Sequence, residues 1–264
     1  MAGILDRFRL DERVAIVTGA SRGLGASVAV ALAEAGADVV IAAREAARLE
    51  ATAGAIRQAG GRVLPVAMDL ADQDSCAGMI RTAVREFGVV DILVNNAGIS
   101  TVRPATRETP AQFREVVETN LMGTYWCCQE FGRAVSRGGS IVNISSNIGS
   151  RSGGIPQAAY ASSKAAIEAM ARDLAAQWGS RKGIRVNTVA PGFFETNMTP
   201  ELNAVMTRAM TQCAPLGRAG VHAEVAAAVV FFASDASSYI TGDVLSVDGG
   251  LSRAGSMFGA MSLG

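Results

Sequence analysis

The chain is poor in the residue types on which several classes of protein depend. Aromatic residues make up 5% of its 264 residues, and its 24 basic side chains are balanced by 24 acidic ones. A nucleic-acid-binding surface needs positive charge and stacking platforms, so nucleic acid is not an expected partner. No apolar run approaches the roughly 18 residues that span a bilayer, and the first ten residues have no signal-peptide core, so no membrane partner is expected.

Histidine and paired cysteines are also scarce. His222 is the only histidine, and the four cysteines at positions 76, 127, 128 and 213 make no CxxC pair. Zinc sites are normally built from clustered histidines and cysteines, so no metal is expected. Unpaired cysteines and the lack of an export signal favour reduced thiols and a cytoplasmic protein.

Hydrophobic residues, by contrast, make up 49% of the chain and recur in a regular order. Short β-branched runs alternate with Ala-rich stretches that end near glycines, which predicts strands alternating with helices. The expected strands are Val14–Val17, Val39–Ala42, Val63–Ala67, Ile92–Val94, Ser140–Ile144, Arg185–Ala190 and Val244–Val247. The expected helices include Gly23–Ala35, Glu45–Ala59, Asp74–Phe87 and one that opens at Tyr160.

This alternation predicts an α/β fold with a doubly wound, parallel, seven-stranded sheet and helices on both faces. No linker, repeat or charge block divides the chain, so residues 1–264 are expected to form a single domain with a core of about 13–250. Residues 251–264 are small in composition. They are expected to form a loose tail, with an arm docked on a neighbouring subunit as the alternative.

Three motifs carry chemistry. Thr18 to Gly25, Thr-Gly-Ala-Ser-Arg-Gly-Leu-Gly, joins an expected strand to an expected helix, where glycines let a backbone turn approach a pyrophosphate. Asn95-Asn96-Ala97-Gly98 follows the fourth strand, where asparagines often only close a turn. Tyr160 and Lys164 are four apart, so they share a helix face, and a neighbouring cation favours the phenolate form of a tyrosine.

Together these motifs resemble the short-chain dehydrogenase/reductase family from about Arg13 to Gly250. Further matches are Asp69-Leu70, Asn120, the strand end Asn143-Ile144-Ser145-Ser146, and the segment Pro191-Gly192-x3-Thr196. The resemblance implies a Rossmann-type sheet of strand order 3-2-1-4-5-6-7 and a homotetramer. It also implies a nicotinamide cofactor and the following cofactor-binding residues: Gly19, Ser21, Arg22, Gly23, Leu24, Gly25, Arg44, Asp69, Leu70, Asn96, Ala97, Gly98, Tyr160, Lys164, Pro191, Gly192, Phe194 and Thr196.

The resemblance further implies hydride transfer at a carbonyl or secondary alcohol, with four catalytic residues and no metal. Tyr160 would move the proton, Lys164 would lower the pKa of Tyr160 and bind the nicotinamide ribose, and Ser146 would donate a hydrogen bond to the substrate oxygen. Asn120 would hold a water molecule that connects Lys164 to solvent. Asn95 would support the central strand.

Two positions depart from the family pattern. Fourteen positions separate Ser146 from Tyr160, one more than usual, so a literal count back from Tyr160 reaches Asn147. Ser146 is nevertheless assigned, because it ends the Asn-Ile-Ser-Ser strand and the loop containing Ser152, Gly153 and Gly154 can absorb one residue. The second departure is Phe194, where the family more often has a small aliphatic residue.

The residues at the end of the second strand favour NADP(H) over NAD(H). An acidic residue at this position would bind the adenosine ribose, but the chain has Ala43 followed by Arg44. Arg44 and Arg22 together could hold a 2′-phosphate. The alternative is that Arg44 pairs with Glu45 or Asp69 in solvent.

The substrate is a small carbonyl or alcohol compound, for which two interpretations stay open. Apolar residues at helical spacing, Met198, Leu202, Val205, Met206, Ala209 and Met210, suggest a lid for an acyl chain, as in 3-oxoacyl-thioester reductases, although ordinary packing would give the same pattern. Polar residues near the expected pocket favour a polyol or sugar acid, as in gluconate 5-dehydrogenases: Asn147, Arg151, Gln157, Glu195 and Asn197. A protein that senses the cofactor without catalysis is the remaining alternative.

Overall fold

The structure, a computed structural model, describes residues 3–151, 154–194 and 211–254. One seven-stranded sheet has the order β3-β2-β1-β4-β5-β6-β7, and every neighbouring pair of strands is parallel. The strands are β1 (Val14–Thr18), β2 (Asp38–Ala43), β3 (Val63–Ala67), β4 (Ile92–Asn95), β5 (Gly139–Ile144), β6 (Ile184–Pro191) and β7 (Val244–Val247). The predicted sheet and its strand order are confirmed, and each expected strand lies within one residue of its observed ends.

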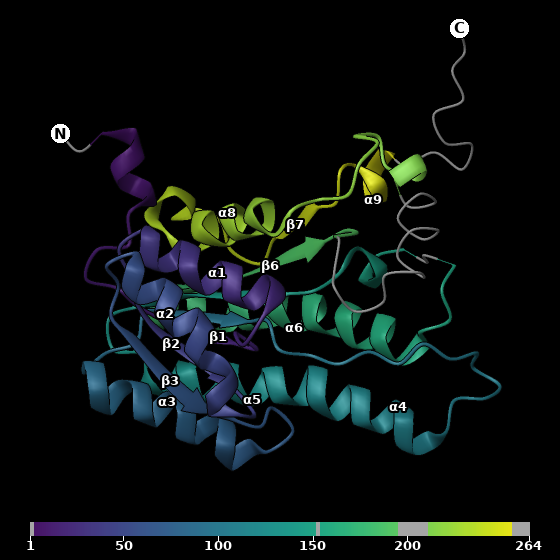
Figure 1. The fold of residues 1–264 in the computed structure, drawn as a ribbon, viewed down its shortest axis with the longest axis horizontal. Helices are drawn as coiled ribbons and strands as arrows, with labels where there is room; N and C mark the ends of the chain where they lie inside the picture. Colours follow the sequence, from purple (N-terminus) through teal and green to yellow (C-terminus); the bar gives the residue numbers. More distant parts are fainter. Residues whose placement is uncertain (1–2, 152–153, 195–210, 255–264) are drawn as a thin grey trace, which may run out of the picture.

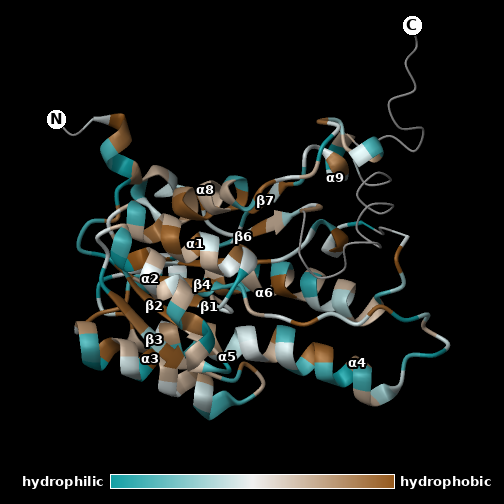
Figure 2. Ribbon diagram, viewed as in Figure 1, coloured by the Kyte–Doolittle hydropathy of each residue, from teal (hydrophilic) through white to brown (hydrophobic). Residues whose placement is uncertain are grey.

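Helices cover both faces of the sheet, which explains why its central strands are apolar on both sides (Figure 1). One face packs against α1 (Gly23–Glu34), α2 (Glu50–Gln58) and α8 (His222–Ala233). The other face packs against α3 (Gln73–Phe87), α5 (Gly123–Ala134) and α6 (Ala158–Lys182). Figure 2 shows hydrophobic residues concentrated on the strands and polar ones on the outer sides of the helices.

The ends of the helices follow from local sequence. Asp72 caps α3, because its side chain accepts a hydrogen bond from the Asp74 N–H at 2.9 Å. Gly88 ends the same helix with a left-handed φ of 77°, a conformation that favours glycine. The expectation of an α-helix from Glu45 is wrong for its first residues. The segment begins as a 3₁₀ turn, η2 (Ala46–Leu49), and becomes α-helical only at Glu50.

Several shorter elements complete the described chain. The segment after β4 contains α4 (Pro110–Val117), which continues through a π-helical turn, η3 (Glu118–Met122), into α5. Three further 3₁₀ turns are η1 (Ile4–Phe8), η4 (Asn147–Gly149) and η5 (Asp235–Ser237). Within the described ranges, no helix has the length and apolar character needed to cross a membrane.

The beginning of the C-terminal segment packs on its own chain. Residues Leu251–Ala254 form the short helix α9, Leu251 is buried, and its carbonyl accepts a hydrogen bond from the Arg151 guanidinium. The expectation of a loose tail from residue 251 is therefore wrong for these four residues. Residues 255–264 lie outside the described part of the chain.

The parallel arrangement places the carboxyl ends of all seven strands along one edge of the sheet. The strand order reverses between β1 and β4, and ligands of doubly wound sheets bind in the crevice outside such a reversal. The segments that follow β1, β2, β3, β4, β5 and β6 all contain residues singled out in the sequence. The fold therefore brings the expected site residues to a common edge.

Two helical glycines, one in a crowded place and one in an open place, allow the packing of α5 to be tested. A Cβ on Gly123, at the start of α5, would collide with the Leu70 carbonyl oxygen and lie 2.5 Å from Leu70 Cγ. A Cβ on Gly54, within α2, would meet no atom within 4 Å. We predict that Gly123→Ala destabilises the protein by about 1–3 kcal/mol, whereas Gly54→Ala stabilises it by about 0.5–1 kcal/mol.

Urea unfolding of both variants at one protein concentration measures the difference. Equal effects of the two substitutions would contradict the close approach of α5 to the segment after β3.

Candidate functional site

The glycine-rich turn between β1 and α1 can accommodate a phosphate. Gly19 and Gly23 have left-handed φ angles of 68° and 58°, and a Cβ on Gly19 would lie 2.8 Å from Ala97 Cα. A Cβ on Gly25 would collide with the Gly19 carbonyl oxygen. Arg22, the N-cap of α1, makes no side-chain capping bond, so the first N–H groups of this helix have no side-chain partner there. These are the donors that bind a pyrophosphate in dinucleotide sites.

Two polar side chains hold this turn against the end of β4. The Thr18 hydroxyl accepts hydrogen bonds from the N–H groups of Asn96 and Ala97, both at 3.1 Å. Asn96 Nδ2 donates to the carbonyl oxygens of Thr18 at 2.9 Å and Gly19 at 3.1 Å. The amide nitrogen of Asn96 therefore holds the glycine-rich turn in place, which agrees with the interpretation that these asparagines close a turn.

The end of β2 lies beside the same turn. The Ala20 N–H donates to the Ala42 carbonyl oxygen at 3.1 Å, so the segments that carry Arg22 and Arg44 run next to each other. Both arginines are exposed, and neither forms an ion pair among the described residues. The alternative pairing of Arg44 with Glu45 is absent, because Glu45 pairs with Arg48 at 3.0 Å.

The segment after β3 carries two further expected cofactor-binding residues, Asp69 and Leu70. Asp69 Oδ1 accepts a hydrogen bond from the Ala71 N–H at 3.0 Å, and Asp69 forms no ion pair with Arg44. Leu70 is buried, against Gly123 of α5. The Asp69 carboxylate is thereby oriented by its own turn.

The catalytic candidates gather where β5 ends and α6 begins. A hydrogen bond joins the side chains of Ser146 and Tyr160, and Lys164 Nζ lies 5.5 Å from the centre of the Tyr160 ring. Lys164 is buried and donates to the Ile144 carbonyl oxygen at 2.8 Å. The strand end and the first turns of α6 therefore bring three of the four candidates together.

Burial dominates the ionisation of this group. It raises the pKa of Tyr160, and the hydrogen bond with Ser146 lowers that pKa by a smaller amount. Burial also lowers the pKa of Lys164 to about 8. The expectation that Lys164 lowers the pKa of Tyr160 is not met here, since the ammonium group is bonded to a carbonyl oxygen and lies over the ring.

Asn120 lies in the π-helical turn η3, between α4 and α5. It is fully buried. Its Oδ1 accepts a hydrogen bond from the Ile99 N–H at 2.8 Å, and its Nδ2 donates to the Ile99 carbonyl oxygen at 2.9 Å. Asn120 Nδ2 also donates to the Ser163 hydroxyl at 3.1 Å. A Cβ on Gly98 would lie 3.1 Å from Asn120 Oδ1 and 3.7 Å from Lys164 Nζ, so both atoms border the same small space.

Ser146 and Asn147 can be compared directly. Ser146 Oγ donates to Asn147 Oδ1 at 3.4 Å, and both side chains are buried. Ser146 is the residue that bonds Tyr160, whereas Asn147 begins the 3₁₀ turn η4. The hydrogen bond between Ser146 and Tyr160 supports the choice of Ser146 despite the extra residue in the loop.

One buried carboxylate beside these residues was not predicted from the sequence. Glu168 lies one helical turn beyond Lys164 and accepts a hydrogen bond from the Ser145 hydroxyl at 2.7 Å. Ser145 also donates to the Lys164 carbonyl oxygen at 3.2 Å. Glu168 thus fixes the residue that precedes Ser146. Glu168 is four residues from Lys164, so its position on the same helix face was the feature of the sequence that could have indicated it.

The loop after β6 begins as expected and then leaves the described residues. The Gly192 N–H donates to the Val247 carbonyl oxygen at 2.9 Å, and a Cβ on Gly192 would lie 2.6 Å from Asp248 Cα. The ring of Phe194 packs against Gly220 and stacks with His222. Thr196, with Glu195, Asn197 and the apolar residues from Met198 to Met210, lies outside the described part of the chain.

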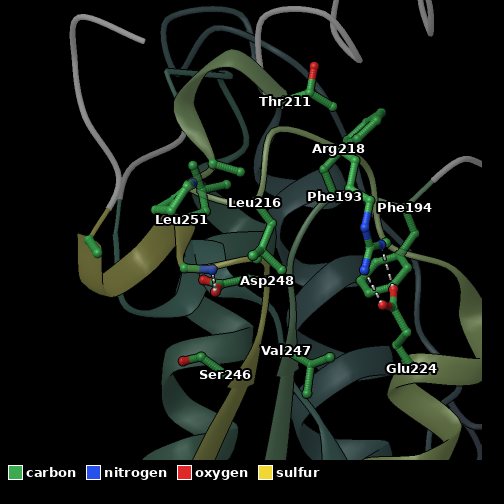
Figure 3. A pocket seen from close by; sticks show the side chains of 16 residues that line it. Phe193, Phe194, Thr211, Leu216, Arg218, Glu224, Ser246, Val247, Asp248 and Leu251 are labelled. Carbon is green, nitrogen blue, oxygen red and sulfur yellow. Dashed lines mark hydrogen bonds and ion pairs between the residues drawn. The ribbon is translucent and has the colours of Figure 1, made fainter. Parts of the chain in front are cut away.

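A cavity of about 420 Å³ lies beside this loop, on the side of β7 and α9 (Figure 3). Phe193, Phe194, Leu216, Val247 and Leu251 give it a largely apolar lining, and the ion pair of Arg218 and Glu224 stands next to Phe194. None of Asn120, Ser146, Tyr160 and Lys164 lines this cavity. It is therefore separate from the catalytic candidates.

The chain is similar to known proteins over almost its whole length. A family model described as enoyl-(acyl carrier protein) reductase matches residues 19–252. A 3-oxoacyl-[acyl-carrier-protein] reductase of Chlamydia trachomatis is 40% identical over 245 residues, 92% of this chain and 98% of that protein. A galactitol 2-dehydrogenase (L-tagatose-forming) of Cereibacter sphaeroides is 41% identical over 252 residues, 92% of this chain and 96% of that protein.

Solved structures give the same result. The structure of a putative 2-deoxy-D-gluconate 3-dehydrogenase of Agrobacterium tumefaciens, with bound NADP, has a TM-score of 0.83 and 36% identity. The alignment covers 93% of this chain and 98% of that one. Other similar structures are described as short-chain dehydrogenases or reductases. With the glycine-rich turn, the parallel sheet and the residues at its carboxyl edge, these matches show that the chain belongs to the short-chain dehydrogenase/reductase family of oxidoreductases.

Proposed function

We propose that the protein is an NADP(H)-dependent reductase of a ketone, of the 3-oxoacyl type, and that it interconverts this ketone and the secondary alcohol. The observation that carries the proposal is the hydrogen bond between Ser146 and Tyr160 with the buried Lys164 beside them. Two hydroxyl groups so placed can both reach one substrate oxygen. A protein that only sensed the cofactor would not need this pair.

When bound, the nicotinamide supplies or accepts the hydride. Tyr160 gives its proton to the carbonyl oxygen during reduction and takes it back during oxidation. Its raised pKa keeps the phenol protonated at neutral pH, which suits the acid role in reduction. Ser146 donates to the same oxygen, where negative charge develops.

Lys164 and Asn120 support this proton transfer. The pKa of Lys164, about 8, lets its amine gain and lose a proton near neutral pH. Lys164 binds the nicotinamide ribose in this proposal, and Asn120, across the space beside Gly98, holds the water that connects Lys164 to solvent. The hydrogen bonds from Asn120 to Ile99 and Ser163 keep its amide in place.

Two observations support NADP(H) as the cofactor. Arg22 and Arg44 are exposed and free of ion pairs among the described residues, on adjacent segments. Guanidinium groups without an opposing carboxylate suit a doubly charged phosphate. The similar structure from Agrobacterium tumefaciens holds NADP.

A polyol or sugar acid is the second candidate substrate. Asn147 and Gln157 are both buried, close in sequence to Ser146 and Tyr160 respectively. Their amides could exchange hydrogen bonds with a hydroxylated substrate. One of the curated relatives is a galactitol dehydrogenase, and another is a 3-oxoacyl reductase, which supports keeping both candidates.

We also propose a cytoplasmic homotetramer. Phe113, Met122 and Tyr125, on α4, η3 and α5, are exposed apolar side chains that a neighbouring subunit would cover. The four cysteines all have free thiols, which fits a reducing compartment.

A panel of 3-oxoacyl thioesters, other ketones and polyols, followed by the absorbance of the reduced nicotinamide, tests the reaction. We predict turnover by the natural protein and none by Tyr160→Phe, which keeps the ring and removes only the proton donor. Cofactor affinity should change little in this variant, whereas Lys164→Ala should lose both affinity and rate. More than about a tenth of the natural kcat in Tyr160→Phe would overturn the assignment, since acid catalysis is usually worth 10²–10⁴-fold.

The position of the oxygen ligand is tested by comparing two neighbours. We predict that Ser146→Ala lowers kcat by roughly 10²–10³-fold, the usual cost of a lost oxyanion donor, and that Asn147→Ala has a much smaller effect on kcat. Steady-state kinetics with one substrate compares the two variants. Equal losses, or a larger loss for Asn147→Ala, would transfer this role to Asn147.

Cofactor choice is tested by titrating NADP(H) and NAD(H) at fixed salt concentration, because screening weakens exposed phosphate contacts. We predict tighter binding of NADP(H) and a loss of that preference when Arg22→Ala and Arg44→Ala are combined. The exposed Arg48, which pairs with Glu45, provides the control Arg48→Ala. A natural preference for NAD(H), or an unchanged NADP(H) affinity in the double variant, would show that these arginines have another role.

A further inference from the structure

His222 stands between two loops of the cofactor site. It is the single histidine of the chain and the first residue of α8. Its imidazole stacks with the Phe194 ring, with 6.3 Å between the ring centres and 22° between the planes. On its other side, the imidazole Cε1 lies 4.0 Å from the place that a Cβ on Gly23 would occupy.

The position of α8 explains this contact. Helices α1 and α8 pack side by side on one face of the sheet, and both begin at the carboxyl edge of the strands (Figure 1). The imidazole therefore spans from the glycine-rich turn to the loop after β6. In a dinucleotide site the pyrophosphate rests on the glycine-rich turn, and the nicotinamide extends from it toward the substrate.

The ring nitrogens of His222 are available for a ligand. Among the residues that the structure describes, the stacking on Phe194 is the interaction of this side chain, and neither nitrogen has a hydrogen-bond partner. The side chain is partly exposed. An imidazole always carries at least one N–H donor, and it carries two when protonated.

We propose that His222 is a cofactor-binding residue that donates a hydrogen bond to the pyrophosphate of NADP(H). This inference rests on the proposed function, because it assigns a contact to the cofactor of that function. Phe194 holds the imidazole in place, and its aromatic ring provides the stacking surface that a small aliphatic residue would lack. The departure at Phe194 and the single histidine thus have one explanation.

Most of the charged groups near His222 have partners of their own. Arg218 and then the Val221 N–H lower the pKa of Glu224 to about 2, so this carboxylate of α8 stays ionised. Arg218 is held by Glu224, and Arg22 precedes Gly23 on α1. Asp248, in the wall of the cavity beside Phe194, accepts hydrogen bonds from the N–H groups of Gly250 and Ser252.

The test is a calorimetric titration of the protein without bound cofactor, using two probes. NADP⁺ carries the pyrophosphate, whereas adenosine 2′-monophosphate carries the 2′-phosphate without it. His222→Phe keeps an aromatic ring for stacking and lacks N–H donors, and His222→Gln keeps a neutral donor. Thermal unfolding of each variant confirms that it is folded.

We expect His222→Phe to bind NADP⁺ about ten-fold more weakly, the size of one charge-assisted hydrogen bond, and adenosine 2′-monophosphate with unchanged affinity. His222→Gln should retain part of the affinity, because its side-chain amide still donates a hydrogen bond.

Natural affinity for NADP⁺ in His222→Phe would overturn the inference, and so would an equal loss for both probes. Neither outcome would affect the proposed function, provided that the natural protein binds NADP⁺ and turns over. Failure of the natural protein to bind NADP⁺ would instead overturn the proposed function. If His222→Phe does not fold, the NADP⁺ affinity of His222→Gln decides the question. A partial loss supports the inference, and natural affinity, or an equal loss for adenosine 2′-monophosphate, overturns it.

Discussion

The hydrogen bonds between the glycine-rich turn and the end of β4 are the constraint on which the site depends. The Thr18 hydroxyl accepts hydrogen bonds from two N–H groups of the segment after β4. In the other direction, the side-chain amide of Asn96 donates hydrogen bonds to two carbonyl oxygens of the turn. These bonds join the two strands between which the order of the sheet reverses. The first N–H groups of α1, which follow this turn, have no side-chain partner at the N-cap. The candidate phosphate site and the candidate catalytic residues thereby share one boundary.

A second set of buried polar contacts holds the catalytic edge. Lys164 bonds the end of β5 through Ile144, while Glu168 bonds the same segment through Ser145. Two neighbouring turns of α6 are therefore hydrogen-bonded to Ile144 and Ser145, the two residues that precede Ser146. A buried amine and a buried carboxylate would each be costly without such partners, so the polar contacts also fix the register of α6 against β5. The geometry of Ser146 and Tyr160 is a consequence of this attachment.

The sequence predicted the features that depend on neighbouring residues. The strand runs, the glycines at the turns and the spacing of Tyr160 and Lys164 are all local patterns, and the sheet formed as expected. It did not predict the stacking of His222 on Phe194 or the hydrogen bond from Ser145 to Glu168, because each joins segments that meet only in the folded chain. The direction of the pKa shift of Tyr160 was also missed. Spacing shows the neighbouring cation, but burial, which dominates the shift, depends on the whole fold.

The similarity to both a 3-oxoacyl reductase and a galactitol dehydrogenase has a physical explanation. In the proposed mechanism, proton transfer uses the same hydroxyl pair and buried amine for either substrate, and these groups lie on the sheet edge and on α6. The loops after β5 and β6, proposed to contact the substrate, can change without disturbing the sheet. Asn147 and Gln157 are buried amides of the first loop, close in sequence to Ser146 and Tyr160 respectively. In the proposed function, the choice between the two substrates depends on whether hydroxyl groups or an acyl chain reach these amides, because only hydroxyl groups can exchange hydrogen bonds with them.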